Sequence, residues 1–160
     1  MRVLALDIAT ETGYYTGDNK PQVVKFPKET RHCSAWEWIK SEIYHKGEAQ
    51  YDVVVIENAI GQMAYALEVF HSLKTIVVLA CKLADIPIVE YSPKTVKKKF
   101  TGSGNAKKED VIAKCLELGI DLPYKVMKSG KNKGEKRYND NAADAVAIYT
   151  IFMEEHDGDS

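Results

Sequence analysis

Four carboxylates have the positions and spacing that phosphate chemistry with metal ions requires. Asp7 lies near the end of the apolar run 3–8, and Glu57 ends the apolar run 52–57. Ligands of open α/β sheets bind beyond the carboxyl ends of the strands, so both side chains are predicted to lie where chemistry occurs. Asp140 and Asp144 are four residues apart in an alanine-rich segment, which puts them on one face of a helix that can approach the sheet closely.

Carboxylates that converge in one place repel one another unless cations compensate them. Hard oxygen ligands favour Mg²⁺, with Mn²⁺ as a substitute, and two such ions about 4 Å apart can activate water and hold a scissile phosphate. We therefore expect Asp7, Glu57, Asp140 and Asp144 to be catalytic and to bind two metal ions. The alternative is a structural role for each, with Asp7 capping a strand end, Glu57 in a salt bridge and Asp140 as a helix N-cap.

The charge is strongly polarised along the 160 residues, although the formal net charge is only -1. Residues 1–93 carry 9 basic and 12 acidic side chains, residues 94–137 carry 13 and 5, and residues 138–160 carry 0 and 6, so the net charges are -3, +8 and -6. A basic block of this size predicts a polyanionic partner, and the alternative is a solvated lysine-rich loop.

Most of the basic side chains in that block can neutralise phosphates without reading bases. The predicted DNA-binding residues are Lys97, Lys98, Lys99, Lys107, Lys125, Lys128, Lys131, Lys133, Lys136 and Arg137. Lys107 and Lys108 open a helix near Gly102 and Gly104, where backbone amides and an ammonium could bind a phosphate together. The loop 125–137 is poor in apolar residues and is expected to be mobile until DNA binds.

The order of apolar runs predicts a single α/β domain. Strands are expected at 3–8, 14–16, 22–26, 52–57 and 86–91, with a turn over 10–13. Helices are expected at 34–46, capped by Ser34, and at 63–84, 93–100, 107–118 and 140–153. The domain therefore covers residues 1–153, and residues 154–160 form an acidic tail that is expected to be disordered.

Several segments resemble the RuvC family of Holliday junction resolvases, over roughly residues 2–152. LALDIATETGYY is similar to the family's first strand with its catalytic aspartate and a following glycine, VVVIENAIG to the strand with the catalytic glutamate, and DNAADAVAI to the C-terminal aspartate helix. The segment PIVEYSPKTVKKKFTGSGNAKKEDV resembles the part that leads into a lysine-bearing helix, and this resemblance implies that Lys108 is the active-site lysine. The motif DIATETG is most similar to the phage and prophage branch of the family.

The resemblance implies an RNase H-like fold, with a central mixed five-stranded sheet flanked by helices. It also implies a homodimer, two divalent ions per active site and paired nicks across a four-way DNA junction. The corresponding enzyme is a crossover junction endonuclease. The similarity of the motif DIATETG to the phage branch implies a role in debranching replicated phage DNA.

Two positions depart from the family pattern. Bacterial members carry an aromatic residue three positions after the catalytic glutamate, where this chain has Ile60. An aliphatic side chain cannot stack on a base, so a weaker preference for four-way junctions over other branches is expected, with Tyr65 as a substitute aromatic. The position three before Asp144 is Asn141, and chemistry favours the carboxylate of Asp140 as the fourth ligand because a neutral amide binds Mg²⁺ less well.

The helix 63–84 has apolar residues on more than one face, and one face should need a partner. The first track is Met63, Leu67, Phe70, Leu73 and Val77, and the second is Tyr65, Val69, Ile76, Leu79 and Leu83. We expect a homodimer through this helix, with Val69 pointing outward. The alternative is that the second track packs under the helix at 34–46.

Other functions share parts of this pattern. They are an RNase H-like nuclease for RNA-containing or non-junction substrates, an actin-like ATP-binding domain, whose phosphate-binding glycines are not evident, and a non-catalytic DNA-binding module. The three cysteines are far apart and odd in number, which predicts reduced thiols. The N-terminal stretch has neither signal-peptide nor membrane-span character, so a cytoplasmic protein without a membrane partner is expected.

Overall fold

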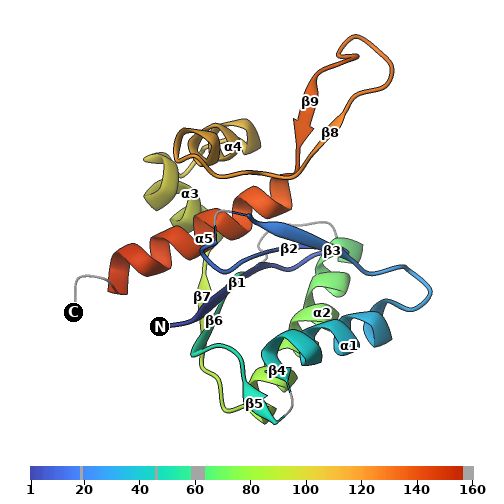
Figure 1. The fold of residues 1–160 in the computed structure, drawn as a ribbon, viewed down its shortest axis with the longest axis vertical. Helices are drawn as coiled ribbons and strands as arrows, with labels where there is room; N and C mark the ends of the chain where they lie inside the picture. The colour runs from blue at the N-terminus through green and yellow to red at the C-terminus, as the bar shows by residue number, and fades with distance from the viewer. Residues whose placement is uncertain (19, 46, 59–63, 157–160) are drawn as a thin grey trace.

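A computed structural model describes residues 1–18, 20–45, 47–58 and 64–156. Its centre is a five-stranded sheet with the spatial order β3-β2-β1-β6-β7. The strands are β1 (Val3–Asp7), β2 (Glu11–Tyr15), β3 (Gln22–Lys25), β6 (Val53–Glu57) and β7 (Ile88–Tyr91). The first three form an antiparallel meander, whereas β1 pairs with β6 and β6 with β7 in parallel. The predicted mixed sheet is therefore confirmed (Figure 1).

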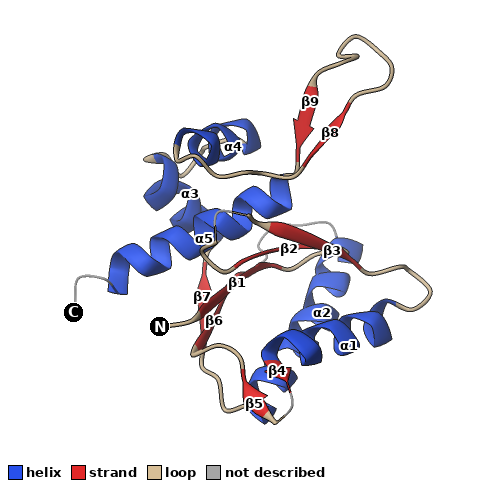
Figure 2. Cartoon of the chain, in the orientation of Figure 1, coloured by secondary structure: helices blue, strands red, loops and turns tan. Residues whose placement is uncertain are grey.

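Helices cover both faces of this sheet (Figure 2). They are α1 (Arg31–Ile43), α2 (Ala64–Leu83), α3 (Pro93–Thr101), α4 (Lys108–Glu117) and α5 (Asp140–His156). Successive residues of a strand point to opposite faces. Leu4 and Leu6 thus belong to the core with α1 and α2, and Val3 and Ala5 to the core with α3, α4 and α5.

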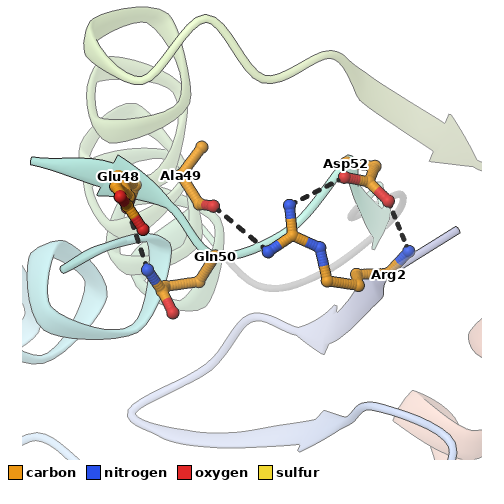
Figure 3. A network of polar contacts seen from close by, with 5 residues as sticks. All are labelled: Arg2, Glu48, Ala49, Gln50 and Asp52. Carbon is orange, nitrogen blue, oxygen red and sulfur yellow. Dashed lines mark hydrogen bonds and ion pairs between the residues drawn. The ribbon is translucent and has the colours of Figure 1, made fainter.

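The starts of the two central parallel strands are joined by one arginine (Figure 3). The backbone N–H of Arg2 donates to Asp52 at 2.6 Å, and its guanidinium donates to the same carboxylate at 2.9 Å. Arg2 also donates to the carbonyl of Ala49 in β5 (Glu48–Ala49), which pairs with β4 (Tyr44–His45). Exposed ion pairs add little stability, so the main effect of this contact is to fix where β1 and β6 begin.

Gly13 lies inside β2, and not in the turn predicted over 10–13. A Cβ atom at this position would lie 2.0 Å from the carbonyl oxygen of Asn141 and 2.7 Å from the backbone nitrogen of Ala142. The first turn of α5 therefore rests directly on the backbone of β2. This contact is possible only because residue 13 has no side chain.

The segment expected to be a mobile loop over 125–137 is instead built on a hairpin that projects from the body of the molecule (Figure 1). Its strands β8 (Tyr124–Val126) and β9 (Lys136–Tyr138) pair in antiparallel fashion. Tyr124 and Tyr138 face each other with ring centroids 5.7 Å apart, and the Lys136 ammonium lies 4.1 Å from the centre of the Tyr124 ring. These cross-strand contacts stabilise the pairing, which low hydrophobicity alone did not indicate.

The buried face of α2 differs from the prediction. Phe70, Leu73 and Val77 are buried as expected, but Val69 of the second track is buried too, because a residue four positions before Leu73 lies on the same face of the helix. The expectation that Val69 points outward is wrong, and Met63 lies outside the described residues.

Among the described residues, α2 is the one helix long and apolar enough to cross a membrane, with a mean hydropathy of 1.4. A helix that covers a protein core has the same length and composition, and Leu73 and Val77 of α2 pack in the core beside the sheet.

Other element boundaries also differ from the prediction. The first helix begins at Arg31 with Thr30 as its N-cap, and the Ser34 hydroxyl hydrogen-bonds to that of Thr30 at 2.9 Å, so Ser34 is not the cap. This helix ends at Ile43 because the chain turns back at β4. The strand expected from residue 86 begins at Ile88. The last helix continues to His156, and residues 157–160 lie outside the described residues.

The contact at Gly13 gives a stability prediction. Gly13→Ala should lower the free energy of unfolding by about 1–3 kcal/mol, because two backbone segments must separate to admit the methyl group. Gly104→Ala is the control, since a Cβ there would meet the side chain of Lys94 at 3.1 Å, which can move aside. Urea unfolding of both variants measures the difference. Equal stability of Gly13→Ala and the unmodified protein would contradict the close contact.

Candidate active site

A cavity of about 490 Å³ opens at the carboxyl ends of β1 and β6. Asp7 is the last residue of β1, Glu57 is the last residue of β6, and Asp144 lies in the second turn of α5. All three line the cavity. Its other polar lining residues are Thr10, Tyr65, Lys97, Lys108 and Asn141.

Strand pairing and one close helix contact bring the three carboxylates together. Leu6 and Ile56 are register partners, so the residues that follow them end their strands side by side. Ala142, Ala143 and Ala145 are fully buried at the start of α5. Their small side chains, together with Gly13, allow Asp144 to reach the sheet, as the sequence predicted.

Burial and neighbouring carboxylates raise the pKa values of all three groups. Burial and then the charges of Asp144, Glu57 and Asp140 raise the pKa of Asp7 well above its usual range. Burial, followed by the charge of Asp144, raises the pKa of Glu57 to about 7. Burial and the charge of Asp140 raise the pKa of Asp144 to about 6. Such groups bind protons or metal cations more readily than isolated carboxylates do.

Two lysines from the helices opposite the strand ends line the same cavity. Lys108, at the start of α4, was predicted to belong to the active site. Lys97, in the middle of α3, was predicted only as a phosphate-binding residue, yet its charge lowers the pKa values of Glu57 and Asp144. Its position beside buried Val96, in a helix that follows the carboxyl end of β7, could have indicated this from the sequence.

Asp140 lies between this cavity and a neighbouring groove. Its carboxylate accepts a hydrogen bond from the Lys108 ammonium, and it lines the groove and not the acidic cavity. Partial burial acts to raise its pKa, but Lys108, a backbone hydrogen bond and Arg137 outweigh this and lower the pKa. Asp140 still acts electrostatically on Asp7 and Asp144.

The residues on either side of Asp140 have other partners. The side-chain carbonyl of Asn139 accepts from the backbone N–H of Ala142 at 2.9 Å, so Asn139 caps α5 and Asp140 does not. The Asn141 amide, which also lines the acidic cavity, donates to the backbone carbonyl of Glu11 at 2.5 Å.

The donor set fits a divalent cation such as Mg²⁺. Its ligands would be carboxylate oxygens at strand and helix ends, with more negative charge than Lys97 and Lys108 compensate. Within the described ranges, no three His, Cys, Asp or Glu side chains already stand close enough to form a complete metal site.

Most of the predicted DNA-binding side chains are exposed, in keeping with phosphate contacts. The exposed ones are Lys98, Lys99, Lys107, Lys125, Lys128, Lys131, Lys133, Lys136 and Arg137. Two of them have partners within the chain, because Lys99 is ion-paired with Glu155 and Lys136 covers the Tyr124 ring. These two are therefore less available to DNA than their neighbours.

The sequence analysis considered two positions for an aromatic side chain that stacks on a base, residue 60 and Tyr65. Ile60 lies outside the described residues. Tyr65 lines the cavity with 60% of its surface exposed, and a hydrogen bond and charge from Arg31 lower its pKa. An exposed ring at the rim is available for stacking.

No protein-family model matches the chain. Among solved structures, it is similar to RuvC of Thermus thermophilus, with 21% identity, a TM-score of 0.64 and coverage of 97% of this chain and 96% of the other. The complex of T. thermophilus RuvC with a Holliday junction substrate matches with 20% identity, a TM-score of 0.67 and coverage of 99% and 96%. The yeast mitochondrial Holliday junction resolvase Ydc2 matches with 12% identity, a TM-score of 0.56 and coverage of 95% and 77%. These likenesses confirm the predicted RNase H-like fold.

The raised pKa of Glu57 predicts how stability depends on pH. The folded protein holds a proton on Glu57 up to about pH 7, whereas the unfolded chain releases it near pH 4.5. Without divalent cations, the free energy of unfolding should therefore fall as pH rises from about 4.5 to 7. Glu57→Gln should remove this loss and stabilise the protein at pH 8 by on the order of 1–3 kcal/mol.

Thermal and urea unfolding at pH 4 and pH 8 measure this effect. Glu37→Gln, at an exposed site on α1, is the control and should leave the pH dependence unchanged. A Glu57→Gln variant less stable than the unmodified protein at pH 8 would contradict the electrostatic description of the cavity.

Proposed function

We propose that this protein is a metal-dependent, structure-selective DNA endonuclease that resolves four-way junctions and also cuts other branched DNA. The observation that carries the proposal is the cavity in which Asp7, Glu57 and Asp144 meet, at the carboxyl edge of the sheet. The fold supports it, because the similar T. thermophilus RuvC was solved with a Holliday junction substrate. The DIATETG motif further suggests a phage or prophage origin.

The chemistry proposed is hydrolysis of a phosphodiester bond. Two Mg²⁺ ions, when bound, would supply an activated water and compensate the charge on the scissile phosphate. Asp7, Glu57 and Asp144 would hold these ions after losing their protons. Lys97 and Lys108 line the same cavity and can place an ammonium group against a phosphate oxygen.

Asp140 is proposed as the fourth metal ligand. It already influences Asp7 and Asp144, and its bond to Lys108 keeps it ionised. It must exchange Lys108 for a metal ion, which would also free the Lys108 ammonium for the phosphate. Metal binding and phosphate binding would then be coupled through this pair.

A homodimer through α2 is also proposed. The helix α1 covers part of the second apolar face of α2, with the His32 ring hydrogen-bonded to the Ser72 hydroxyl at 3.0 Å. Leu79 and Leu83 nevertheless remain 50% and 69% exposed. A second copy of the chain would cover them and would place two active sites on one junction.

One cleavage experiment tests the proposed function. The purified protein is incubated with labelled four-way, three-way, flap and linear duplex DNA, and with an RNA–DNA hybrid, with and without Mg²⁺. Symmetric nicks in four-way junctions that require Mg²⁺ are expected. Cleavage of the hybrid alone would favour an RNA-directed nuclease, and binding without cleavage of any substrate would favour a non-catalytic module.

Catalysis and DNA binding should be separable. Asp7→Asn should reduce junction cleavage by about 10³-fold or more, because metal ions contribute several kcal/mol to such reactions. Junction affinity should change little, since it depends on the basic residues. Gel-shift and single-turnover assays measure both, with Glu37→Gln as a surface control. Equal loss of binding and cleavage would refute this division.

Asp140→Asn tests the fourth ligand. Cleavage should fall on the order of 100-fold, and the affinity for Mn²⁺ measured by calorimetry should fall as well. Lys108→Gln is the matched control for the calorimetry and should not lower the Mn²⁺ affinity, because it removes the other half of the same ion pair but no metal ligand. If Asp140→Asn keeps normal Mn²⁺ affinity and nearly normal cleavage, Asp140 only holds Lys108.

The dimer prediction now uses Leu79 in place of Val69. The unmodified protein should have a light-scattering mass of twice 17.9 kDa, and Leu79→Glu should give the monomer. Leu116→Glu, at an exposed leucine on α4, should leave the mass unchanged. A mass of 17.9 kDa for the unmodified protein would exclude the homodimer.

A further inference from the structure

A second groove of about 380 Å³ lies between the edge of the main sheet and the base of the β8–β9 hairpin. Its walls come from parts of the chain that are far apart in the sequence. Lys25 ends β3, Lys125 lies in β8 and Arg137 lies in β9, and all three line this groove. Three cationic side chains thus converge from the sheet and the hairpin.

Two of these cations are direct cross-strand neighbours. Lys125 and Arg137 are register partners in the hairpin, and like charges in this arrangement disfavour the pairing. In the described part of the chain, neither they nor Lys25 forms an ion pair with a carboxylate. The positive charge of the groove is therefore available to an anionic ligand from outside.

The acidic residues in the same groove have partners of their own. Glu11 accepts a hydrogen bond from the Asn139 side chain at 2.6 Å, and Asp140 accepts one from Lys108. The repeated positive charge continues beyond the groove into the hairpin, whose residues 124–138 carry six basic side chains and one acidic one. A chain of regularly spaced negative charges matches this surface better than a single small anion.

The groove lies next to the acidic cavity. Asp140 lines the groove, its partner Lys108 lines the cavity, and Asn141 next to it lines the cavity as well. A strand that places one phosphate in the cavity would therefore enter the groove with its neighbouring nucleotides.

We propose that this groove binds the sugar–phosphate backbone of the DNA arm that flanks the cleaved phosphate, with Lys25, Lys125 and Arg137 contacting its phosphates. The hairpin then extends along the same arm through the lysines at its tip, Lys128, Lys131 and Lys133. Lys136 instead stabilises the hairpin, since its ammonium lies on the Tyr124 ring. This inference rests on the proposed nuclease function and adds Lys25, from an element outside the basic segment, to the DNA contacts.

Salt dependence of binding gives the first test. The logarithm of the affinity falls with the logarithm of the salt concentration, with a slope of about −0.9 for each phosphate contact. The double variant Lys25→Gln/Arg137→Gln loses two contacts, so its slope should be less steep by about 1.8. Its affinity for a four-way junction in Ca²⁺ should fall on the order of tenfold. Lys20→Gln/Lys40→Gln, with the same charge change at exposed sites outside the groove and outside α2, should keep the original slope.

Cross-linking from the groove gives a second test that does not depend on the first variant folding. Lys25→Cys in a Cys33→Ser background leaves Cys81 and Cys115, both buried, as the other thiols. A photoreactive group attached at residue 25 should cross-link to nucleotides of the arm next to the cleavage position. An unchanged salt slope, or cross-links absent from that arm, would overturn the inference. If the unmodified protein cleaves branched DNA in the same experiments, the proposed function would still stand.

Discussion

The direct contact between the first turn of α5 and the backbone of β2 at Gly13 is the constraint on which the candidate site depends. It lets an alanine-lined helix lie close to the sheet, so that Asp144 reaches the strand ends that carry Asp7 and Glu57. It also places Asp140, which directly precedes Asn141 in the sequence, between the acidic cavity and the basic groove. The position of one glycine thereby affects the arrangement of both the cavity carboxylates and the cations that line the neighbouring groove.

The same arrangement has an electrostatic cost. The pKa values of Asp7, Glu57 and Asp144 are all raised, so the folded protein is strained by their charges at neutral pH when no cation compensates them. Bound divalent ions would reverse that cost and couple stability to function. The Lys108 ammonium already supplies part of this compensation, because it acts to lower the pKa values of Asp7 and Asp144, whereas Asp140 adds to the repulsion.

The sequence was sufficient for the features that depend on local pattern. The apolar runs that end at Asp7 and Glu57 predicted both the strands and the position of the cavity at their ends. The alanines around Asp144 predicted that the last helix packs closely against the sheet. Features that depend on distant partners were missed. The hairpin is held by contacts between Tyr124, Tyr138 and Lys136 across a long tip, and the role of Lys97 depends on how α3 packs. Val69 was wrongly predicted to be exposed because α2 has two apolar faces, and which of them is buried depends on how the helix packs against the sheet.

We propose that the cavity brings Asp7, Glu57 and Asp144 together so that they bind divalent ions. Crystals grown with Mn²⁺ and a four-way junction, with anomalous scattering recorded at the manganese edge, test it most directly. The account predicts manganese peaks in the cavity, each within coordination distance of these carboxylates and of one phosphate of the DNA. Carboxylates that remain without a metal ion beside a correctly bound phosphate would contradict it.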